Sequence, residues 1–78
     1  MTNQDRFETA LAGHYRELFQ SPDYAMAAAR TTPEALARKM TCGILTGSAN
    51  HDGEGIRRTC RDLGIRFSAS AIREFLRA

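Results

Sequence analysis

The residues best suited to chemistry in this chain are arginines, and they concentrate near its end. Residues 1–50 hold five basic and five acidic side chains, whereas residues 51–78 hold six arginines and four acids, so the net charge of +2 arises entirely in residues 51–78. A guanidinium group presents a planar fork of donors that matches phosphate and carboxylate oxygens. A GC-rich genome, whose codons favour arginine and alanine, would produce the same excess. The candidate residues for binding nucleic acid or another anion are Arg57, Arg58, Arg61, Arg66, Ser68, Ser70, Arg73 and Arg77.

A helix-turn-helix would bring these side chains together. Two short amphipathic segments within residues 56–77 are joined by Gly64-Ile65-Arg66-Phe67-Ser68. A recognition helix needs cations for phosphates and forked or hydroxyl donors for base edges. The pattern departs from this motif because, with Gly64 as the turn glycine, Ser70 stands where a buried aliphatic side chain is expected. The alternative is two packed helices whose arginines are solvated.

The loop at residues 51–55, His-Asp-Gly-Glu-Gly, is a second candidate anion site. Gly53 and Gly55 precede a helix, so their amides could bind an anion. However, no strand precedes them, and the third glycine of a dinucleotide fingerprint is missing. The histidine and two carboxylates of the loop are too few and wrongly spaced for a metal site. The alternative is a turn in which Asp52 caps the following helix.

No arrangement of residues points to catalysis. His14 lies at the centre of an apolar helical face, where a histidine is usually a hydrogen-bonded member of a core or an interface. Cys42 and Cys60 form no Cys-x-x-Cys pair, and neither has a spacing that pairs it with a histidine. Cys60 lies on an apolar helical stripe, which predicts a small buried thiol. We therefore expect a protein that is not an enzyme and that uses no metal or cofactor.

Helices have to position these side chains, because the composition disfavours strands. Val and Trp are absent, and twelve of the apolar residues are alanine. Cap and stop signals predict helices at residues 4–19 and 22–30, followed by one that a Thr31–Glu34 capping box opens. Two more helices are predicted, one ending at Leu63 before Gly64 and one capped by Ser68. The sequence thus predicts one all-α domain, residues 1–78, of four to five short helices, its last two forming a candidate helix-turn-helix.

The first predicted helix carries more apolar surface than a domain this small can easily cover. The chain has only 19 large apolar side chains, and a domain of this size buries about 60% of its unfolded surface. The face is either the core of the domain or the interface of a homo-oligomer or of a complex with a partner protein. Its residues are Phe7, Leu11, Tyr15, Leu18 and Phe19.

The sequence shows no sign of export or membrane insertion. It has no run of about 18 apolar residues, and its first residues are polar, so neither a membrane span nor a signal peptide is expected. With only two cysteines, we expect a cytoplasmic protein with reduced thiols.

Residues Thr32 to Leu76 resemble short proteins of uncharacterised function encoded in bacteriophage and prophage genomes. The resemblance lies in the segments TPEALARKM, GSANHDGEGIRRTC, DLGIR and AIREFL, and it covers a little over half of the chain. It implies a phage context, in which compact single-domain proteins regulate phage genes or block host defence and transcription. The resemblance assigns no site residue.

Two functional hypotheses follow from the sequence. The first is a non-enzymatic binding protein whose arginine-rich C-terminal helices contact nucleic acid or another acidic surface. The alternative is a phage-encoded inhibitor or adaptor that presents helix surface to a host protein. Both are compatible with a homo-oligomer.

Overall fold

The first helix follows from its cap and its apolar spacing. In the computed structural model, which describes residues 1–78, α1 spans Asn3–Leu18. The Thr2 hydroxyl accepts a hydrogen bond from the Asp5 amide, and the Asp5 carboxylate accepts one from the Thr2 amide. This capping box satisfies two amides that a helix start leaves unpaired. Phe7, Leu11 and Tyr15 recur at intervals of four residues, and all three are buried.

The remaining chain forms one 3-10 helix and four α-helices, without a strand. Their bounds are η1 Pro22–Tyr24, α2 Ala25–Arg30, α3 Pro33–Thr46, α4 Glu54–Leu63 and α5 Ala69–Arg77. The prediction of an all-α fold is therefore confirmed. The predicted Thr31–Glu34 capping box is wrong by one residue: Thr32 caps α3 by accepting from the Ala35 amide. Extended backbone at Thr31 and Thr32 precedes Pro33, as proline requires of the residue before it.

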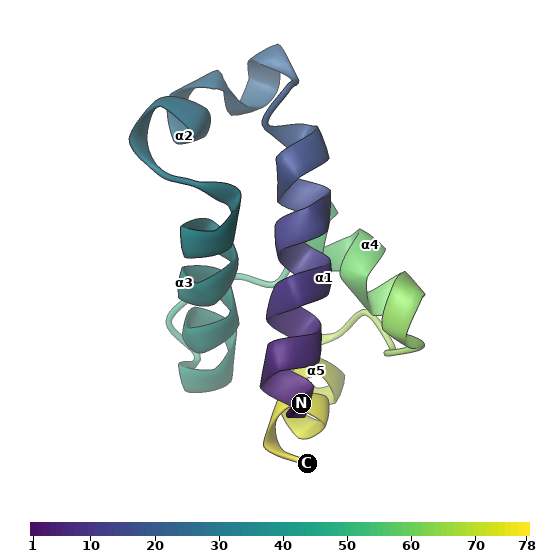
Figure 1. Ribbon diagram of the computed structural model, residues 1–78. Helices are drawn as coiled ribbons and strands as arrows, with labels where there is room; N and C mark the ends of the chain where they lie inside the picture. Colours follow the sequence, from purple (N-terminus) through teal and green to yellow (C-terminus); the bar gives the residue numbers. More distant parts are fainter.

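The helices are arranged around α1 (Figure 1). Helix α3 runs antiparallel to α1 on one side, α4 packs against the other side, and α5 contacts both α1 and α3 near the N-terminus. Helices α4 and α5 scarcely contact each other, and neither do α3 and α4. Helix α1 thus supplies the common surface on which the other helices assemble.

The core lies where α3, α4 and α5 meet α1. The close approach of α4 to α1 depends on Gly55, in the first turn of α4. A Cβ at Gly55 would lie 2.6 Å from Cε1 of Tyr15 and 3.2 Å from Cδ1 of Leu11, both in α1. The buried apolar residues are Phe7, Leu11, Ala12, Tyr15, Ala37, Ile44, Ile56, Cys60, Ile72 and Leu76. The predicted burial of Cys60 is confirmed, and its pKa is raised by that burial.

The apolar face of α1 serves this core. Phe7 and Leu11 have no exposed surface and Tyr15 is 5% exposed, so these three side chains are not available to an oligomer or a partner. This corrects the interface prediction for them in favour of the alternative that this face forms the core. Leu18 and Phe19 are half-buried and pack on the edge of the same core.

The segment between α1 and α3 lies outside the core. We call η1 and α2, residues Pro22–Arg30, the arm; it extends past the end of α1 and contains no buried residue (Figure 1). One contact of the arm with the domain is aromatic: the Tyr24 ring centroid lies 6.2 Å from that of Phe19. Met26, in α2, is 70% exposed.

Candidate functional site

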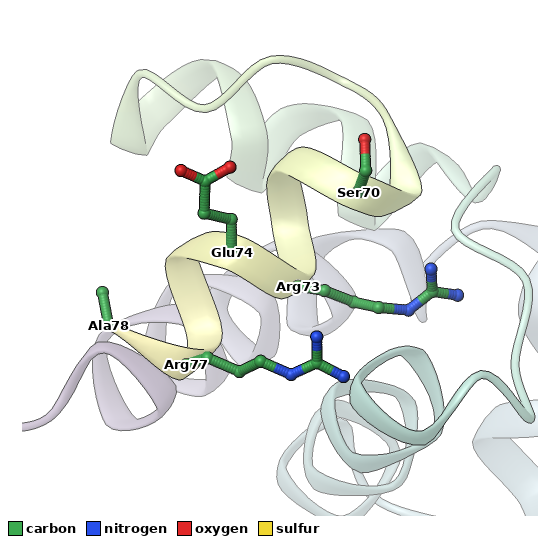
Figure 2. Close-up of a pocket in the computed structure, with 5 residues that line it drawn as sticks. All are labelled: Ser70, Arg73, Glu74, Arg77 and Ala78. Carbon is green, nitrogen blue, oxygen red and sulfur yellow. The ribbon is translucent and has the colours of Figure 1, made fainter.

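The arginines of the C-terminal third do not share one face. Arg57, Arg58 and Arg61 project from the outer side of α4, opposite the buried Ile56 and Cys60. On α5, the side chains of Arg73 and Arg77 extend together toward α3, while Glu74 points in a different direction (Figure 2). Because α4 and α5 scarcely contact each other, the predicted single arginine face divides into two groups.

Helices α4 and α5 do not form a helix-turn-helix unit. The five residues Gly64–Ser68 separate them, whereas that motif joins two packed helices by a turn of 3–4 residues. Each helix packs instead on α1. The alternative, two helices held separately by the core, is the one that the packing supports.

Arg73 has a structural role. Its Nε donates to the carbonyl oxygen of Ile44 at 2.9 Å, near the C-terminal end of α3. A cation there is favourable because unpaired carbonyls give a helix C-terminus partial negative charge. Ser68 also has a structural role, because its hydroxyl accepts a hydrogen bond from the Ala71 amide and so caps α5.

An open depression of about 550 Å³ lies along the outer side of α5. Its lining, shown in Figure 2, is Ser70, Arg73, Glu74, Arg77 and Ala78. Arg77 is exposed and makes no hydrogen bond or ion pair within the chain. The depression therefore offers one uncommitted cation beside a carboxylate, which is a poor anion site.

The arginines of α4 differ in how far they are neutralised. Arg58 lies between two acids: its Nε donates to Glu54 at 3.1 Å and its Nη1 lies 3.8 Å from Glu17. Asp62, four residues after Arg58, pairs with His14 and not with Arg58. Arg57 has only a longer contact with Glu54, at 3.8 Å. Arg61 is exposed and has no partner within the chain.

Arg57 also contacts an aromatic ring. Its guanidinium carbon lies 4.8 Å from the ring centroid of Phe67, a cation–π contact. The imidazole of His51 meets the same ring edge-on, with 5.3 Å between centroids. Phe67, which follows Arg66 in the chain, therefore lies against the Arg57 guanidinium. We call Arg57, Arg61 and Arg66 the basic patch, with Phe67 as its base.

Phe67 is the member of this site that the sequence did not indicate as a binding residue, and His51 was predicted only as part of the candidate anion site at residues 51–55. The available signal was an aromatic residue in a turn, flanked by Arg66 and Ser68. An isolated aromatic in a loop is as often a core anchor as a site residue, and nothing local links it to residue 51 or 57.

His14 pairs with Asp62 of α4. Its Nε2 lies 2.5 Å from Oδ2 of Asp62, and its side chain is 20% exposed. The expectation that His14 is hydrogen-bonded is confirmed. Cys42 is exposed and Cys60 buried, and both are free thiols.

The loop at residues 51–55 leads directly into α4. Gly53 is the N-cap of α4 and receives no side-chain cap, so the expected Asp52 cap is wrong. Gly55 is buried beneath Tyr15, where its role is close packing. The structure contains no group of three or more His, Cys, Asp or Glu side chains able to hold a metal ion. None of the helices has the length and apolar character to cross a membrane.

Comparison with known proteins gives no relative: no family model, curated protein or solved structure matches this chain significantly.

Proposed function

We propose that this chain is a non-enzymatic binding protein that holds nucleic acid through the basic patch of α4 and the α4–α5 turn. The observation that carries the proposal is that Arg61 and Arg66 are exposed and unpartnered while Arg57 contacts Phe67, the residue next to Arg66. Exposed cations without internal acids are free to neutralise phosphates. The weak total charge of +2 suits a local contact.

Salt dependence of binding tests this proposal. The affinity for nucleic acid should fall with rising salt by about 0.7–0.9 log units per log unit of salt for each phosphate neutralised. Arg61→Ala and Arg66→Ala should each weaken binding and reduce that slope by about one such step, measured by fluorescence anisotropy with labelled oligonucleotides at low salt. Arg38→Ala is the matched control, because it removes an exposed arginine from α3, away from the patch. Absence of binding to every oligonucleotide at low salt would exclude the proposal.

A second candidate function is favoured by the arm. Met26 is 70% exposed on a helix that buries no residue, so its side chain is accessible to a partner protein. An inhibitor or adaptor that binds a host protein would use this surface, and the phage context that the resemblance implies fits both candidates. Met26→Glu would then abolish nuclease-insensitive capture of one partner from host lysate, while leaving oligonucleotide binding unchanged.

A further inference from the structure

The basic patch contains a guanidinium that already contacts an aromatic ring. The guanidinium carbon of Arg57 lies 4.8 Å from the centroid of the Phe67 ring, yet 59% of the Arg57 side chain remains exposed. The guanidinium group is therefore held against the ring and is still open to solvent. The carboxylate of Glu54, 3.8 Å from Nε, is a second contact that limits the positions of the group.

Phe67 is held in turn by the core and by the loop before α4. It lies in the turn between α4 and α5, is half-buried on the core, and receives His51 from the preceding loop at its edge. An aromatic residue immobilised in this way limits the conformational freedom that Arg57 would lose on binding. A side chain ordered in advance binds with a smaller entropic cost.

The chemistry that such a surface recognises is a flat π-system next to phosphates. Nucleobases that are unpaired stack on guanidinium planes and aromatic rings, and every base offers a π-face regardless of sequence. Arg61, one helical turn from Arg57 on α4, and Arg66, next to Phe67 in the chain, are exposed cations without an internal partner. A stacking surface flanked by cations is the arrangement that single strands require.

Helix α5 is poorly suited to reading a duplex. Reading a duplex groove usually requires an exposed helix with donors on its outer side. On α5, Arg73 is already bonded to α3, and the carboxylate of Glu74 lines the same depression as Arg73 and Arg77. Glu74 would repel a phosphate backbone there.

We propose that Arg57, stacked on Phe67, is a platform for a base of single-stranded nucleic acid, and that Arg61 and Arg66 contact the flanking phosphates. This inference rests on the proposed function and specifies the class of nucleic acid. Single-stranded DNA and RNA share the recognised chemistry.

The experiment compares labelled oligo(dT), oligo(U) and a DNA duplex of equal length by fluorescence anisotropy at low salt. We expect at least one single strand to bind more tightly than the duplex. Arg57→Lys keeps the charge but removes the planar group, so it should weaken single-strand binding at least fivefold with the salt slope unchanged, consistent with about 1–3 kcal/mol per stacked base. Phe67→Leu should have a similar effect, and Arg38→Lys should have none. Retained thermal stability of Arg57→Lys, which alters an exposed position, shows that the fold is intact.

Three results would overturn the platform. Equal or tighter binding of the duplex, unchanged single-strand affinity in Arg57→Lys, or competition by poly-glutamate as effective as that by oligo(dT) would each show that the patch recognises charge alone. In the first two cases, the proposed nucleic-acid function would stand if Arg61→Ala still weakened binding. Only failure of every oligonucleotide to bind would remove the function itself.

Discussion

The value of an arginine for binding in this chain depends on what its guanidinium already contacts. Arg73 donates to the Ile44 carbonyl and Arg58 lies between two acids, whereas Arg61 has no internal partner. Residue type and spacing treat all three alike, because Ile44 precedes Arg73 by 29 residues. The sequence thus identified the arginines as a group, but their division into structural and available side chains depends on tertiary contacts.

Two helical glycines provide a matched test of packing. A Cβ at Gly55 would lie 2.6 Å from the ring of the buried Tyr15, whereas one at Gly13 would meet nothing within 4 Å. Gly55→Ala should therefore lower the free energy of unfolding by about 1–3 kcal/mol through overpacking. Gly13→Ala should raise it by about 0.5–1 kcal/mol, since alanine loses less backbone entropy in a helix. Urea denaturation of both variants checks this, and equal effects would contradict the packing described for α1 and α4.

Tyr15 should link stability to alkaline pH. Burial, with a smaller contribution from Tyr24, raises its pKa from 10.0 to about 12. The unfolded chain therefore loses this proton at lower pH than the folded chain does. The contribution of Tyr15 to stability is full below pH 10, and it declines as the pH rises from 10 toward 12. Tyr15→Phe should remove this part of the alkaline loss of stability.

Phenolate absorbance measures the same shift directly. In Tyr24→Phe, Tyr15 is the only tyrosine, and its absorbance change should occur well above pH 10 in the folded protein, because burial is the larger cause of the shift. The same variant in concentrated urea supplies the reference titration. Coincident titrations of the folded and unfolded samples would show that Tyr15 is not buried.

At the scale of elements, the sequence predicted most helix ends because caps are local. Thr2 at α1, Ser21 before Pro22 and the left-handed Gly64 after α4 all act through neighbours within five residues. The error at Thr31 arose because two adjacent threonines both fit a cap before Pro33. The sequence could not predict that α4 and α5 would pack on α1 in preference to each other. That outcome depends on how faces far apart in the chain fit together.

The end of α3 depends on a residue from another element. Arg73→Ala removes the charged donor to Ile44 and should lower the free energy of unfolding by about 1–2 kcal/mol. Arg77→Ala, one turn later on α5, removes an exposed arginine without a partner and should change stability by less than about 0.5 kcal/mol. Thermal and chemical denaturation compare the two. If both variants were equally stable, Arg73 would be free for binding and its structural assignment would fail.

At the scale of the whole molecule, α1 joins the helices into one cooperative unit while the arm remains outside it. Helices α3, α4 and α5 all bury residues, and each contacts α1. In the arm, α2 spans only Ala25–Arg30 and buries none. The sequence predicted a helix in the arm from Pro22 and the alanines. It could not predict that this helix would bury no residue, because alanine suits buried and exposed helices equally.

This division predicts two levels of protection against amide hydrogen exchange. Isolated helices shorter than about 12–15 residues are marginal in water, and α2 spans 6 residues with no buried side chain to stabilise it. Its amides should exchange through local opening, whereas amides of α1 near Leu11 and Tyr15 should exchange only through global unfolding. Gly55→Ala then serves as the control: by destabilising the core it should accelerate exchange in α1 and leave that in α2 nearly unchanged. Suppose instead that the amides of α2 were as protected as those of α1 and that their exchange rates changed together in Gly55→Ala. The arm would then belong to the cooperative core, and the proposal that Met26 forms an exposed contact surface would fail.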